Sequence, residues 1–183
     1  SIAPTSKQFD IFAGLKGKLA GNISYNIRGS YVNENDRALF VAFPLPNPTD
    51  PNLIENAEPY QFGNAFGVIY DDVKTISFFG EVKADLSKNI SAGINGTFRS
   101  LSAKDLAEVW NVPSITLGAN VEANITDKWF AGMNLFFVGE RFDLVTAPDL
   151  LNDPNFYTFN KVTLDSYLDM NANVGYKYNE RLT

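Results

Sequence analysis

Apolar and polar residues alternate one by one in several stretches of the chain, and residues 22–31 are the first clear example. Odd positions there are apolar or small, as at Ile23, Tyr25 and Ile27, and even positions are polar or charged. A period of two is typical of a β-strand whose side chains point alternately to opposite faces of a sheet. Residues 22–31 therefore predict a strand with one apolar face and one polar face.

The same alternation returns in later and earlier stretches, each about ten residues long. These segments are residues 9–19, 76–86, 90–99, 115–125, 129–140 and 164–178. Small or polar residues that suit tight turns separate several neighbouring segments, at residues 20–22, 87–89 and 126–128. The pattern therefore predicts antiparallel hairpins whose short turns lie on one side of a sheet.

Longer connections join these hairpins on the other side. Regular alternation is absent between about residues 34 and 72, and several prolines there forbid a continuous ladder of strand hydrogen bonds. These are Pro44, Pro46, Pro48, Pro51 and Pro59. Residues 102–113 are predicted as a second long loop, and about two dozen residues before residue 164 as a third.

Charge is confined to one of the two rows of side chains. The apolar rows of the segments contain no charged residue, whereas the polar rows hold six acidic and six basic side chains. A charge on the lipid face of a membrane barrel costs about 2–4 kcal/mol near the bilayer centre, so this segregation is typical of a barrel in lipid. We predict that the following charged residues face the lumen: Arg28, Glu81, Lys83, Arg99, Glu122 and Glu140.

These features predict an all-β fold, namely a transmembrane antiparallel up-and-down β-barrel of at least seven strands. Residues 1–183 are expected to form a single domain. A further turn begins at residues 179–180, and only three residues follow it. Because a closed barrel leaves no strand edge unpaired, we expect this chain to be a segment, incomplete at both ends, of a larger barrel.

A soluble β-sandwich or lipocalin-like barrel would show the same alternation, with the apolar rows turned onto a protein core. The placement of aromatic residues favours lipid, because membrane barrels carry aromatic girdles at both interfaces. The aromatic residues near the short turns are Tyr25, Trp129, Tyr176 and Tyr178. Those near the long loops are Tyr31, Phe98 and Phe137.

Composition narrows the possible functions. The chain has no cysteine and no histidine, so it lacks thiolate ligands and the commonest general base and metal ligand. We therefore expect no enzymatic activity, no metal site and no cofactor. A net charge of −6 also argues against binding nucleic acid through its phosphates. The longest apolar stretch, residues 38–46, is too short for a membrane helix and contains proline.

Residues 164–183 read LDSYLDMNANVGYKYNERLT. This stretch resembles the penultimate hairpin of TonB-dependent-receptor-type barrels, especially those of Bacteroidetes, in which a pattern such as LDxYxDLNxxxxYKFNxRLS precedes the last strand. Residues 113–141, which end in FVGER, are similar to the preceding hairpin. The resemblance implies a many-stranded outer-membrane transporter of a Gram-negative bacterium, with an N-terminal plug domain and energy supplied through a periplasmic partner.

The leading hypothesis for function is an outer-membrane receptor or transporter for nutrient uptake whose long extracellular loops capture the ligand. Expected partners are outer-membrane lipid and either a periplasmic energy-coupling protein or a surface lipoprotein. Exposed loop aromatics are the candidate ligand contacts, because rigid rings supply contact area at little entropy cost. They are Tyr60, Phe62, Trp110, Phe156 and Tyr157.

Three alternatives stay open. Each of these aromatics could instead pack its loop onto the barrel mouth. The chain could belong to a small, eight-stranded outer-membrane barrel that anchors an envelope complex, since eight strands enclose only enough room for side chains. It could also form a soluble β-barrel that binds a small apolar ligand.

Overall fold

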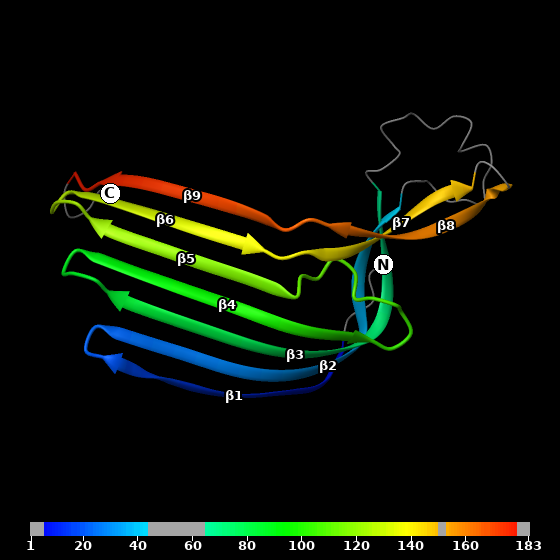
Figure 1. The fold of residues 1–183 in the computed structure, drawn as a ribbon, viewed down its shortest axis with the longest axis horizontal. Coiled ribbons are helices and arrows are strands. Elements are labelled where there is room, and N and C mark those ends of the chain that lie inside the picture. The colour runs from blue at the N-terminus through cyan, green and yellow to red at the C-terminus, as the bar shows by residue number, and fades with distance from the viewer. Residues whose placement is uncertain (1–5, 44–64, 150–152, 179–183) are drawn as a thin grey trace.

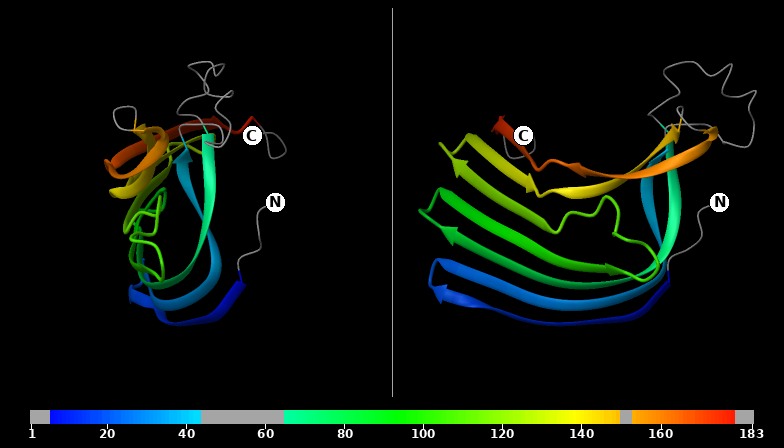
Figure 2. Two further views of the ribbon diagram at one scale, coloured as in Figure 1. Left: turned by 90° about the vertical axis from the view of Figure 1, so that its right-hand side faces the viewer. Right: turned by 45° about the vertical axis from the view of Figure 1, so that its right-hand side comes forward.

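The computed structural model describes residues 6–43, 65–149 and 153–178, and within them the chain forms nine strands of one curved sheet (Figures 1 and 2). The strands are β1 (Ser6–Ala20), β2 (Ile23–Phe43), β3 (Ala65–Asp85), β4 (Ile90–Ala103), β5 (Ile115–Asn124), β6 (Trp129–Val138), β7 (Arg141–Asp149), β8 (Asp153–Leu164) and β9 (Tyr167–Tyr176). The described part of the chain holds no helix that is long and apolar enough to cross a membrane. The all-β prediction is confirmed.

The strands follow the order β8-β7-β2-β3-β4-β5-β6-β9, with β1 paired to β2. Consecutive strands from β1 to β6 pair antiparallel, and β6 pairs antiparallel with β9. Short turns join them at one end, where Leu86 N–H donates to Ile90 O at 2.9 Å and Ile125 N–H donates to Trp129 O at 2.8 Å. The seven predicted segments thus correspond to β1–β6 and β9.

The predicted loop over residues 34–72 is wrong in part, because β2 and β3 continue well into it. Their pairing extends to Phe43↔Ala65, and it is interrupted only by a register shift between Glu34 and Arg37. Asp36 lies at this shift with φ of 51°. A bulge inserts a residue and moves every later side chain to the other face, so the alternation breaks although the pairing continues.

The third predicted loop is also wrong, because β7 and β8 form an antiparallel hairpin there. β7 begins directly after β6, with only Gly139 and Glu140 between them, so the β7–β8 hairpin prolongs the β6–β9 pair. The distal half of β2 bends toward this hairpin and meets β7 at one parallel bridge, Ala42↔Val145 (Figure 1). Pro148 and Pro154 lie in these strands and are typical of loops, but proline is also compatible with strands at the edge of a sheet.

Register places the two kinds of row on opposite sides of the sheet. One row across six strands runs Lys16, Asn26, Glu81, Asn95, Gly118 and Phe136, and the neighbouring row runs Gly17, Tyr25, Val82, Ile94, Ala119 and Leu135. We call the first side the polar face and the second the apolar face. Large side chains of the apolar face are open, with Leu15, Leu168 and Val174 each 67–69% exposed.

Candidate functional site

The polar face gathers most of the charged residues that were predicted to face a lumen. Arg28 pairs with Phe79, which lies two residues from Glu81 and four from Lys83 on the same face of β3. Arg99 joins this face through its pairing with Ser77, and Glu122 through its pairing with Ser91. These five residues therefore share one continuous face.

Glu140 does not belong to a strand row. The predicted sixth segment ran through Glu140, but β6 ends at Val138 and Glu140 lies in the connection to β7. Gly139 N–H donates to Ile115 O at 2.8 Å, which fixes the chain as it leaves β6. The strand prediction was two residues too long at this end.

Contacts within and between strands hold the charged side chains of the polar face. Lys83 Nζ lies 3.1 Å from Glu81 Oε2, and the Arg28 guanidinium carbon lies 5.8 Å from the centre of the Phe79 ring. The Lys177 Nζ atom lies 5.7 Å from the centre of the Phe130 ring. Exposed pairs of this kind add little stability, about 0–1 kcal/mol each. They make a hydrated wall of mixed charge.

Asparagine side chains of the polar face lie across glycines of the neighbouring strand. A Cβ atom added at Gly93 would lie 2.6 Å from Asn120 Oδ1, and one added at Gly132 would lie 2.6 Å from Asn173 Oδ1. The glycines therefore leave room for polar amides to lie against the sheet. Near the short turns this surface borders a cavity of about 800 Å³, whose polar lining includes Glu122, Asn134 and Lys177. Such a surface offers many hydrogen-bond partners.

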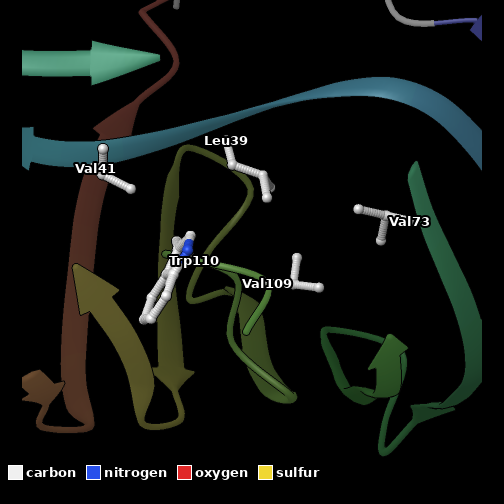
Figure 3. Packing of buried hydrophobic residues seen from close by; sticks show 5 residues of the cluster. All are labelled: Leu39, Val41, Val73, Val109 and Trp110. Carbon is white, nitrogen blue, oxygen red and sulfur yellow. The ribbon is translucent and has the colours of Figure 1, made fainter. Parts of the chain in front are cut away.

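At the other end of the sheet, residues 104–114 fold back onto the polar face. We call this β4–β5 connection the docked loop. Its Val109 and Trp110 are 7% and 4% exposed and pack with Leu39 and Val41 of β2 and with Val73 of β3. Figure 3 shows Trp110 on the side of Val41 and Leu39, and Val109 toward Val73. The bulge in β2 produces this core, because it turns Leu39 and Val41 toward the polar face.

The buried position of Trp110 corrects the prediction that its ring is exposed in a loop. The ring packs the loop onto the strands, which was the alternative left open for each loop aromatic. Tyr60 and Phe62 lie outside the described residues. Phe156 and Tyr157 lie in β8 rather than in a loop, and their side chains are outside the described part of the structure. Their role in ligand binding stays a prediction.

Asp71 of β3 holds the docked loop by its backbone. Its carboxylate accepts hydrogen bonds from Leu106 N–H at 2.8 Å and from Asp105 N–H at 3.0 Å, and the residue is 6% exposed. Burial alone would raise the pKa of Asp71, but these donors and the backbone N–H groups of Asp72 and Lys104 outweigh it and lower the pKa below its ordinary value. The carboxylate is thus held in its charged form.

A second set of contacts ties the docked loop to β2 and β7. Asn111, at φ of 60°, donates from Nδ2 to Phe40 O at 2.9 Å and to Asp143 Oδ1 at 2.8 Å. Asparagine tolerates this left-handed conformation better than most residues. The Glu108 carboxylate also forms an ion pair with Lys161 of β8. The loop therefore bridges strands that are far apart in sequence.

Asp71, Asn111 and Asp143 were not identified from the sequence. Two signals were present: acidic residues within an otherwise β-prone stretch at Asp71–Asp72, and an Asn-Val-Pro run at residues 111–113. Neither signal indicates which partner the side chain contacts, because those partners come from other strands.

No family model and no curated protein sequence matches the chain. Solved structures do match. The chain is similar to the pyoverdine outer-membrane receptor FpvA of Pseudomonas aeruginosa, with 16% identity, a TM-score of 0.59, 98% of this chain covered and 24% of the receptor. It is also similar to the siderophore receptor PirA of Acinetobacter baumannii, with 15% identity, a TM-score of 0.58, 93% of this chain covered and 25% of the receptor.

The copper transporter OprC matches at 12% identity with a TM-score of 0.56, over 98% of this chain and 24% of the transporter. The fold is that of an outer-membrane receptor barrel. In membrane barrels of this kind a polar face lines the lumen and an apolar face meets lipid. The chain spans about a quarter of the length of these proteins.

The similarity to TonB-dependent-receptor-type barrels is thereby confirmed for the fold. FpvA and PirA come from Pseudomonas and Acinetobacter and give no support to a Bacteroidetes origin, which stays a prediction. Asp71 lies fourteen residues along β3 from Asp85 at the short turns. At about 3.3 Å per residue and a tilt of about 45°, this places it about 33 Å away, beyond an apolar band about 25 Å tall. In a membrane barrel, a position at this distance from the short turns lies outside the lipid-facing band, on the side of the long loops.

Proposed function

We propose that this chain forms part of the wall of an outer-membrane receptor that takes up a small nutrient. One observation carries the proposal: a continuous polar face lined by amides and balanced charges, in a receptor-barrel fold, with a loop docked on that face at one end. A wall of this kind suits passage of a polar solute, because it offers hydrogen bonds without a strong single-sign field. The similar proteins are a pyoverdine receptor, a siderophore receptor and a copper transporter, so a metal–siderophore complex is the first substrate to test.

In this proposal the short turns face the periplasm, and the docked loop and the β7–β8 hairpin face outward. Energy for uptake would come from a periplasmic TonB-type coupling protein, as the similarity to TonB-dependent receptors suggests. A surface lipoprotein is a further proposed partner. The protein would have no enzymatic activity, since its role would be to bind and pass the solute unchanged.

Residues 44–64 are the proposed ligand-capturing segment, because they join the outward ends of β2 and β3 and contain Tyr60 and Phe62. Phe43 and Ala65 are direct partners across the sheet, so a short glycine-containing turn can replace residues 44–64 without stretching either strand. In the intact protein, we expect this replacement to reduce ligand binding at least tenfold while the barrel still assembles in the outer membrane and keeps its heat-modifiable mobility.

The matched control replaces the short turn at residues 87–89 with an Asn-Gly turn, which alters the opposite end of a neighbouring strand pair. We expect binding to be unchanged in this control. Unaltered binding after replacement of residues 44–64 would show that this segment does not capture the ligand.

A further inference from the structure

The apolar face contains a hollow over the middle of the sheet. Gly80 of β3 and Gly96 of β4 are direct cross-strand partners at its centre, so two neighbouring strands lack a side chain at the same level. The surrounding walls include Phe78, Ile94 and Leu117, and the hollow measures about 800 Å³. It therefore has the size of a small-molecule site. Large apolar side chains project from the rest of this face.

Packing does not require glycine at position 80. A Cβ atom added there would meet nothing within 4 Å, and one added at Gly96 would come within 3 Å only of Leu117 Cδ2, the end of a rotatable side chain, at 2.9 Å. Glycine inside a strand is destabilising relative to alanine, because it loses more conformational freedom on folding. The two glycines are therefore not needed to avoid a clash within the sheet, and their effect is to leave an open space on its apolar face.

The lining of the hollow suits hydrocarbon. Its side chains are apolar apart from the Tyr25 hydroxyl. Glu81 and Asn95 also border it, but strand alternation directs their side chains to the polar face, so they contribute backbone. No charged side chain in the described part of the chain therefore faces into the hollow.

The depth of the hollow matches the centre of a bilayer. Gly96 lies seven residues from Asn89 in the short turn. At about 3.3 Å per residue and a tilt of about 45°, this is about 16 Å, within about 4 Å of the middle of an apolar band about 25 Å tall. Exposed Lys88 and Lys128 lie in the short turns, at the level of lipid phosphates. The positive charge of these lysines and the depth of the hollow thus fit a lipid whose head group lies at the short turns and whose acyl chain reaches the hollow.

We propose that this hollow is a binding site for one acyl chain of a membrane phospholipid, with its phosphate near Lys88 or Lys128. The inference rests on the proposed placement of the apolar face in the membrane, since the hollow is continuous with that face. A bound chain would fill the space above Gly80 and Gly96, so that the surface presented to bulk lipid becomes even.

Photo-crosslinking tests this site in the intact protein. The probe is a phosphatidylethanolamine with a diazirine near the end of one acyl chain, added at increasing mole fraction to vesicles that contain the protein. Trypsin then yields peptides 75–83 and 89–99, which carry Gly80 and Gly96, and peptide 29–37 from the same face. We expect saturable labelling of 75–83 and 89–99, and at least a fivefold loss of it in Gly80→Leu.

Gly29→Leu is the matched control. A Cβ atom at Gly29 also meets nothing within 4 Å, Gly29 lies on the apolar face, and it does not line the hollow. This variant should keep full labelling of 75–83 and 89–99. Because both variants add the same side chain to an open position of the same face, a difference between them reports filling of the hollow.

Three results would overturn the inference. Labelling that rises linearly with the mole fraction of the probe and is equal in all three peptides would show contact with bulk lipid only. The placement of the apolar face in the membrane would then still stand. Equal saturable labelling in Gly80→Leu would place the lipid elsewhere on this face. If no peptide of the apolar face is labelled, the hollow holds no acyl chain, and this result also contradicts the proposed function.

Discussion

At the residue scale, Asp71 of β3 holds the docked loop in place, because its one carboxylate accepts hydrogen bonds from the backbone N–H groups of two consecutive loop residues. Charged hydrogen bonds contribute about 1.5–3 kcal/mol, against about 1 kcal/mol for neutral ones. The isosteric change Asp71→Asn should therefore weaken loop docking by about 1–2 kcal/mol. Hydrogen exchange at the amides of Asp105 and Leu106 measures this, and we expect it to accelerate by about tenfold.

Asp72→Asn is the control for this change. Asp72 forms an exposed ion pair with Lys104 at 3.1 Å, and such pairs contribute about 0–1 kcal/mol. Exchange at residues 105 and 106 should change little in Asp72→Asn. Equal acceleration in the two variants would mean that general charge, and not the Asp71 hydrogen bonds, holds the loop.

The lowered pKa of Asp71 also predicts how docking depends on pH. A carboxyl group whose pKa is lower in the folded state stabilises that state at pH values above its unfolded pKa, and the contribution disappears as pH falls through the lowered folded value. Docking should be constant around neutral pH and weaken only in strong acid. Trp110 fluorescence reports it in a background where every other tryptophan, including Trp129, is replaced by Phe. The acid transition should be absent in Asp71→Asn, and an unchanged transition there would assign it to another group.

At the element scale, the bulge at Asp36 decides which side chains of distal β2 reach the docked loop. Deleting Asp36 should remove the extra residue, restore simple pairing with β3 and turn Leu39 and Val41 to the opposite face. We expect Trp110 to become exposed, with a red-shifted emission and quenching by iodide. Asp36→Gly is the control, because glycine adopts a φ of 51° freely and keeps the bulge. A buried Trp110 in the deletion variant would contradict this account of the core.

The sequence predicts a strand well where its alternation of apolar and polar residues is uninterrupted, and poorly where a bulge or a proline interrupts it. Strands such as β5 alternate without interruption because each face meets one environment, and residues 115–125 were predicted almost to the residue. The distal half of β2 was not predicted because one bulge exchanges its two faces. β7 and β8 were not predicted because each contains a proline, which is typical of a loop. The burial of Trp110 depends on β2 and β3, which are distant in sequence, so no local pattern marks it.

At the scale of the whole molecule, the sheet has a face that no described residue covers and a polar face that carries its own loop-capped core. Large apolar side chains such as Ile76 and Met170 are each 61% exposed on the first face. A soluble β-barrel would turn these rows onto a core, whereas a receptor barrel exposes them to lipid. The central claim is therefore that lipid meets one face of this sheet and that the other face lines the lumen.

The most direct test uses single cysteines introduced into residues 1–183, which contain none, with any cysteine elsewhere in the protein replaced by serine. In the intact protein, Ile76→Cys and Met170→Cys place a thiol on the apolar face, and Ser77→Cys and Asn171→Cys place one on the polar face of the same strands. Each thiol is labelled with bimane, and the protein is reconstituted with phospholipid brominated in its acyl chains. We predict strong quenching at positions 76 and 170 and little at 77 and 171. Equal quenching within each pair, or the reverse pattern, would contradict the account.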